Sequence, residues 1–139
     1  MIQLSVGEPT IHPDLSKFLE TVFETKVVPN YTTNGIVLAS DTPQSEELLE
    51  ATRNFVGGVA VSYGNKKIRT QADKAIEKLL AKGDCKVMIH HLLSDKNSVD
   101  ELLEAETKWG DDIHYHVLLP LKRHGRSNDE MTEETYLYL

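Results

Sequence analysis

Gly7-Glu8-Pro9-Thr10 is the stretch from which the fold of this chain can be worked out. It follows a strand-like run, Ile2–Val6, and an amphipathic helical pattern begins soon after it, near Pro13. A strand, a turn containing glycine and proline, and a helix start together predict a β-α connection that carries a carboxylate. Ligands of α/β proteins bind at such connections, beyond the carboxyl ends of the strands. Turns of this composition also occur without any function.

The alternation of strand and helix continues along the chain. Further strand-like runs are found at 26–33, 56–64, 85–93 and 113–120. Helical patterns lie between them: one starts around Thr42-Pro43, one ends at Gly83, and one starts at a capping-box pattern of Ser98 with Glu101. The helix that begins near Pro13 is expected to bury Phe18 and Phe23 among its apolar residues, and the helix that begins at Ser98 is expected to bury Leu103.

Strands that alternate with helices at this spacing predict a parallel sheet with helices on the outside, in the α/β class. An open doubly wound sheet and a partial (β/α) barrel of about five strands both fit this pattern. A closed eight-stranded barrel does not, because it takes about 250 residues. We expect one domain over residues 1–126, followed at 127–139 by a tail or the start of a further helix.

Composition excludes several classes of function. With 15 basic and 22 acidic residues the net charge is −7, which disfavours binding to nucleic acid. No apolar run approaches the roughly 20 residues that span a bilayer, so no membrane association is expected. The one cysteine, Cys85, rules out an internal disulfide and favours a reducing, cytoplasmic location. Cys85 is expected to pack in the core.

Polar residues follow the strand-like runs at comparable positions. In a parallel sheet the carboxyl ends of the strands meet at one rim, so we expect these side chains to form a single cup. A cup with a carboxylate, an amide, a hydroxyl, imidazoles and cations suits a small molecule with both charges, such as an amino-acid moiety. Its members would be Glu8, Asn34, Ser62, His90 or His91, Ser94, Lys122 and Arg126.

Four of these segments resemble radical S-adenosylmethionine (radical SAM) enzymes. Residues 5–15, SVGEPTIHPDL, are similar to the segment after the second strand of that family, which carries Gly-Gly-Glu-Pro. Thr33-Asn34-Gly35 resembles the end of the family's third strand, and residues 59–63, VAVSY, resemble its fourth. Residues 118–122, LLPLK, with Gly125-Arg126, are similar to the sixth strand and its exit. The order and spacing match across nearly the whole chain.

The resemblance implies a site for S-adenosylmethionine. Gly7, Glu8 and Pro9 would hold the amino group of its methionine part. Ser62 would contact the ribose or the carboxylate, and backbone groups near Leu119 would face the adenine. The other residues implied in this pocket are Asn34 and His90.

Two departures from the family pattern limit what this chain could do. Val6 stands where the family has its first glycine, which adds a side chain where backbone approaches the ligand. The CxxxCxxC segment that binds a [4Fe–4S] cluster is missing, and one cysteine cannot hold such a cluster. The resemblance therefore implies a fragment that binds S-adenosylmethionine and becomes an enzyme only when a segment outside this chain, or a partner chain, supplies the cluster.

The sequence also fits two other interpretations of function. The chain could be a non-catalytic remnant that binds a nucleotide or another protein. His114 and His116, with His90 or His91, could instead form a metal site. In either case an incomplete barrel exposes its edge strands, so we expect self-association or a partner chain that covers the open edge.

Overall fold

The computed structural model describes residues 2–4, 7–64, 66–83 and 85–121. The predicted tail at 127–139 lies outside these residues, as do Val6, Lys122 and Arg126. The strands are β1 Ile2–Leu4, β2 Pro29–Thr33, β3 Gly58–Ser62, β4 Lys86–Leu93 and β5 Tyr115–Pro120. The helices are η1 Pro9–Ile11, α1 Leu15–Glu24, α2 Ile36–Ala39, α3 Pro43–Phe55, η2 Lys66–Ile68, α4 Arg69–Lys82 and α5 Lys96–Trp109.

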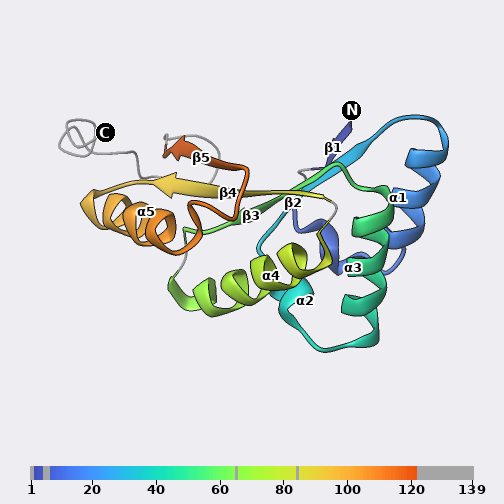
Figure 1. Cartoon of the computed structure of the whole chain (residues 1–139), viewed down its shortest axis with the longest axis horizontal. Helices are drawn as coiled ribbons and strands as arrows, with labels where there is room; N and C mark the ends of the chain where they lie inside the picture. The colour runs from blue at the N-terminus through green and yellow to red at the C-terminus, as the bar shows by residue number, and fades with distance from the viewer. Residues whose placement is uncertain (1, 5–6, 65, 84, 122–139) are drawn as a thin grey trace.

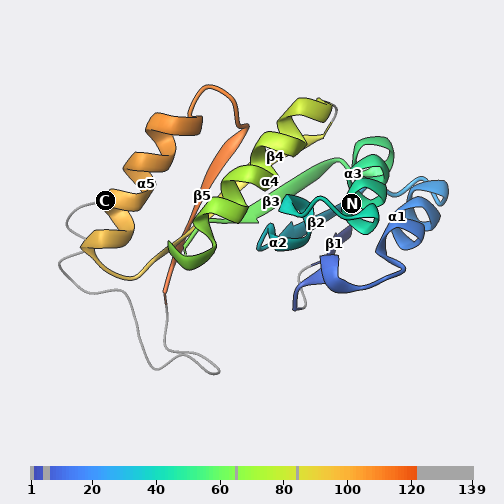
Figure 2. The ribbon, with the colours of Figure 1, turned by 90° about the horizontal axis from the view of Figure 1, so that it is seen from below.

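The five strands form one parallel sheet in which spatial order follows chain order, β1-β2-β3-β4-β5. The α-helices lie along one face of this sheet, and the other face carries no helix among the described residues (Figures 1 and 2). Helices on a single face are typical of a barrel wall, whereas a doubly wound sheet has them on both faces. The fold is therefore α/β and corresponds to a partial (β/α) barrel, as predicted.

The core lies between the sheet and its helices. Alternate residues of the central strands point toward the helices, because successive side chains of a strand point to opposite faces. Tyr31 is fully buried there, and its hydroxyl lies 2.8 Å from Thr52 Oγ1 of α3. The other large side chains fully enclosed in this layer include Leu19, Leu48, Ile76, Val59, Val61, Val87 and Ile89.

Proline and capping residues mark several ends of the strands and helices. Pro29 is the first residue of β2, where the missing N–H is tolerated. Thr42 caps α3 by accepting a hydrogen bond from Ser45 N, and Gly83 ends α4 with φ +86°. The predicted start of α5 at Ser98 is wrong. Asp95 is its N-cap: the Asp95 carboxylate accepts from Ser98 N at 2.9 Å, and Ser98 Oγ accepts from Asp95 N at 3.1 Å.

Three residues predicted to be buried are exposed. Phe18, Phe23 and Leu103 have 45%, 42% and 59% of their surface accessible. The buried face of α1 includes fewer residues than its apolar pattern predicts. The Phe23 ring packs against the Phe55 ring instead, with the ring centroids 5.7 Å apart. None of the described helices combines the length and the apolar character needed to cross a membrane.

Candidate functional site at the carboxyl ends of the strands

The carboxylate of Glu8 joins the loop after β1 to the end of β2. Its Oε1 accepts hydrogen bonds from Thr10 Oγ1 at 2.5 Å and from Thr33 Oγ1 at 2.7 Å, with Thr10 N at 3.3 Å. Its Oε2 accepts from Asn34 N at 2.7 Å. Thr10 and Thr33 are themselves almost fully buried. Because hydrogen bonds to a charged acceptor are strong, Glu8 fixes the geometry of the loop.

The residues around Glu8 complete the rim of this loop. Pro9 opens the short helix η1, and Gly7 has φ +67°, a conformation that favours glycine. A Cβ on Gly7 would meet nothing within 4 Å, so the backbone there is open to approach. Asn34 uses its Oδ1 to accept from Ile36 N at 2.9 Å, which shapes the turn into α2. Its side chain therefore has a structural role as well.

A hollow of about 450 Å³ lies farther along the same rim. Ser62 pairs with His90 in the sheet register, and Leu92 pairs with Leu119, so these four side chains share the helix-free face. Burial lowers the pKa of His90, which favours the neutral imidazole. The residues that line the hollow are Ser62, Gly64, Ile68, His90, Leu92 and Leu119.

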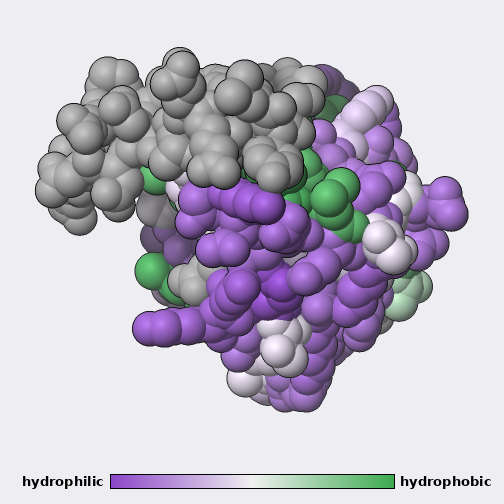
Figure 3. All heavy atoms as spheres, turned by 90° about the vertical axis from the view of Figure 1, so that its left-hand side faces the viewer, coloured by the Kyte–Doolittle hydropathy of each residue, from purple (hydrophilic) through white to green (hydrophobic). Residues whose placement is uncertain are grey.

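The structure thus places the predicted site residues in two groups. Gly7, Glu8, Pro9 and Asn34 surround the ends of β1 and β2. Ser62, His90 and Leu119 line one hollow at the ends of β3 to β5. The sequence does not indicate Thr10 and Thr33 as partners of Glu8, and the one local signal is that Thr33 directly precedes Asn34-Gly35. Figure 3 views the molecule from this end, where the exposed surface is mostly hydrophilic with small hydrophobic areas.

The histidines do not form the three-ligand metal site that the sequence allows. His91 points to the helix side, opposite to His90, and is 2% exposed. Its Nε2 lies 2.8 Å from His116 Nδ1, and His116 Nε2 lies 2.8 Å from Glu106 Oε2. His114 is exposed, and its Nδ1 accepts from Val87 N at 3.3 Å. The described residues contain no group of three or more histidine, cysteine or acidic side chains suited to a metal ion.

The residues of this chain also do not fit an iron–sulfur cluster. Cys85 directly precedes β4, at the end of the sheet opposite to the candidate site, and packs partly buried against the core. A [4Fe–4S] cluster is bound by several thiolates, and the chain has one cysteine.

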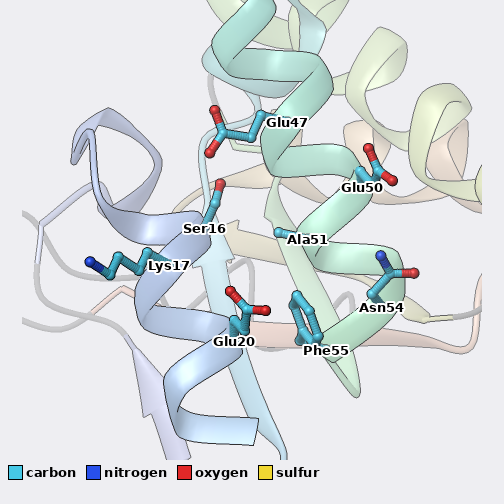
Figure 4. Close-up of a pocket in the computed structure, with 8 residues that line it drawn as sticks. All are labelled: Ser16, Lys17, Glu20, Glu47, Glu50, Ala51, Asn54 and Phe55. Atoms are coloured by element: carbon cyan, nitrogen blue, oxygen red, sulfur yellow. The ribbon is translucent and has the colours of Figure 1, made fainter. Parts of the chain in front are cut away.

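A second hollow of about 450 Å³ lies between α1 and α3. Figure 4 shows Glu20 of α1 together with Glu47 and Glu50 of α3 around it, with Ser16 between the two helices. All three glutamates are solvent-exposed. Exposed helix faces are the ordinary place for acidic residues, so this hollow is not part of the candidate site.

The described residues define a class of protein: a parallel α/β partial barrel with polar side chains at the carboxyl ends of its strands. Solved structures of SuiB from Streptococcus suis share this fold. SuiB alone matches with a TM-score of 0.71 at 16% identity, over 98% of this chain and 34% of SuiB. SuiB bound to S-adenosylmethionine matches with a TM-score of 0.68 at 15% identity, over 98% of this chain and 35% of SuiB. SuiB bound to the precursor peptide SuiA matches with a TM-score of 0.60 at 17% identity, over 84% of this chain and 27% of SuiB.

This chain therefore spans about a third of the length of the SuiB structures that it matches. Identities this low show a common fold only. No family model matches the sequence, and no curated protein matches it either.

Proposed function

We propose that this chain is part of a radical SAM enzyme core that binds S-adenosylmethionine at the carboxyl ends of its strands and is not catalytic by itself. The observation that carries the proposal is the hollow lined by Ser62, His90 and Leu119, three residues selected from sequence as ligand contacts. Its volume of about 450 Å³ lies within the range of about 300–1,000 Å³ that small-molecule pockets occupy. The fold shared with SuiB, including SuiB bound to S-adenosylmethionine, gives further support.

In this proposal the two groups of site residues bind different parts of the ligand. The methionine amino group lies at Gly7-Glu8-Pro9, where the Gly7 backbone is open. Glu8 Oε1 already accepts three hydrogen bonds and Oε2 only one, so Oε2 is the oxygen with capacity left for an ammonium group. Asn34 borders this part. The adenosyl part occupies the hollow with Ser62, His90 and Leu119.

Catalysis would need a cluster from outside this chain, either from another segment or from a partner chain. Reductive cleavage of S-adenosylmethionine depends on that cluster in the family that this chain resembles. We therefore expect binding without turnover when the chain is assayed alone.

Replacing Ser62 with leucine is expected to weaken S-adenosylmethionine binding at least tenfold, because the larger side chain fills part of the hollow. Isothermal titration calorimetry measures the affinity. Ser16→Leu is the matched control: Ser16 lines a hollow of the same volume between α1 and α3, and this variant should bind like the native chain. Equal affinities for the native chain and Ser62→Leu would contradict the proposed site. If the folded native chain releases no heat, the non-catalytic remnant becomes the better explanation.

We also propose that the open edge of the sheet is covered by a second copy or by a partner chain. Among the described residues β5 pairs only with β4, and Tyr115, Leu118 and Leu119 on β5 are each more than 40% exposed. An unpaired strand edge that carries apolar side chains favours association.

Leu118→Lys is expected to shift the chain toward the monomer, since a charged side chain at a strand edge blocks pairing. Sedimentation velocity over a range of protein concentrations measures this shift. The control is Leu103→Lys, which makes the same change on the exposed surface of α5. A native chain that remains monomeric at high concentration would count against self-association.

A further inference from the structure

A third hollow, of about 610 Å³, lies at the opposite end of the sheet from the proposed S-adenosylmethionine site. Asn30, Gly58 and Lys86 form one row across β2, β3 and β4. Their neighbours Tyr31, Val59 and Val87 point into the core, so this row lies on the helix-free face. The residues that line the hollow are Lys26, Val28, Asn30, Gly57, Gly58, Lys86 and Met88.

Two glycines keep this hollow open. A Cβ on Gly57 would lie 2.6 Å from Val28 Cγ1 and 3.0 Å from Asn30 Oδ1. A Cβ on Gly58 would lie 3.1 Å from Met88 Cε. The floor is therefore backbone, flanked by the apolar side chains of Val28 and Met88. Such a surface suits an alkyl group.

The charged groups around this floor are two cations. Lys26 and Lys86 are both exposed, and neither has an ion-pair partner among the described residues. Asn30 Oδ1 is enclosed and accepts no hydrogen bond. It lies beside Gly57, and the other polar atom of this side chain, Nδ2, is a hydrogen-bond donor. Two ammonium groups and an amide N–H together favour a carboxylate.

Lys26, which lines the hollow, has an unusual backbone conformation. Lys26 follows the end of α1 with φ +66°, the left-handed conformation that usually holds glycine after a helix. A lysine there costs about 1 kcal/mol more than glycine. The chain nevertheless has a lysine at the mouth of the hollow.

We propose that this hollow binds a small carboxylate with an apolar body, of which a medium-chain alkanoate is the simplest example. The alkyl chain lies over Gly57 and Gly58 against Val28 and Met88. The carboxylate binds between Lys26 and Lys86 and accepts from the Asn30 amide. This site is separate from the proposed S-adenosylmethionine site and does not depend on it.

The test is a titration with octanoate, followed through the ¹³C-methyl signal of Met88. We expect a saturable shift with a dissociation constant on the order of 1 mM, because a ligand this small has few atoms with which to offset the cost of binding. Lys26→Gln/Lys86→Gln should weaken binding at least tenfold. Lys17→Gln/Lys66→Gln removes two positive charges elsewhere and should leave binding unchanged. A shift that does not saturate, equal binding of octanol, or full binding by the Lys26/Lys86 variant would each overturn the proposal.

Discussion

Asp73→Ala is expected to lower the free energy of unfolding by about 3 kcal/mol, because it leaves buried donors without an acceptor. Asp73 Oδ1 accepts from Tyr63 Oη at 2.6 Å and from Trp109 Nε1 at 3.1 Å, and Oδ2 lies 2.8 Å from Lys108 Nζ. Tyr63 and Trp109 are 5% and 6% exposed. One carboxylate thus connects the residue after β3, helix α4 and the end of α5.

The charge state of Asp73 agrees with this role. Burial acts to raise the pKa of Asp73, but the hydrogen bonds from Lys108, Tyr63 and Trp109 outweigh it and hold the pKa below its usual range. Burial and the neighbouring Asp73 carboxylate raise the pKa of Tyr63, so its hydroxyl remains a donor. The carboxylate is therefore charged while its neutral partners donate to it.

Urea unfolding followed by circular dichroism measures the effect of Asp73→Ala. The matched control is Asp41→Ala, because Asp41 also has two lysine partners, Lys74 and Lys78, but its side chain is 74% exposed. Exposed ion pairs contribute little to stability, so this variant should unfold like the native chain. Equal losses in the two variants would show that the buried donors are not the source of the effect.

The chain is also expected to lose about 3 kcal/mol of stability as the pH falls from 6.5 to below 4, through His91 alone. Burial lowers the pKa of His91 to about 4, with smaller contributions from the charges of His116, His90 and Arg69. The unfolded chain binds a proton at this residue near pH 6.5, whereas the folded chain does so only near pH 4. Since the unfolded state binds more protons in this window, stability decreases as the pH decreases.

His91→Phe isolates this contribution, because phenylalanine fills the same position beside Tyr63 and His116 without titrating. Stability is measured by urea unfolding at intervals between pH 3 and 7. The free energy of unfolding of the native chain should fall more steeply with decreasing pH. The variant should keep only the pH dependence that comes from its other titratable side chains. Parallel curves for the two proteins would contradict the assignment to His91.

The sequence predicted those features that depend on local patterns. Runs of strand and helix patterns predicted the five parallel strands, and Thr42 and Gly83 marked helix ends that the structure confirms. The strand-end rule brought Ser62 and His90 together because all parallel strands end at one rim, whereas Leu119, which lines the same hollow, was implied by the family resemblance alone. The four-residue helix α2 was missed, since it is too short to show a helical period.

Features that depend on sheet register could not be read from the sequence. Thr33 reaches Glu8 because Leu4 pairs with Tyr31, which aligns the ends of β1 and β2. His91 meets His116 for a similar reason, since β4 and β5 are paired in the register that joins Ile89 to His116. Both contacts join residues about 25 positions apart. No local pattern carries that information.

Strand order that follows chain order has a consequence for how this chain is assembled. Paired residues of neighbouring strands are 27 positions apart for Ile2 and Pro29, 28 for Asn30 and Gly58, 28 for Gly58 and Lys86, and 27 for Met88 and Tyr115. Each strand-and-helix unit can therefore dock on the unit made just before it, with a short loop to close each time. The sheet can grow in the direction of synthesis on the ribosome without waiting for distant segments. Gain or loss of a whole unit at either end would leave the remaining pairings intact.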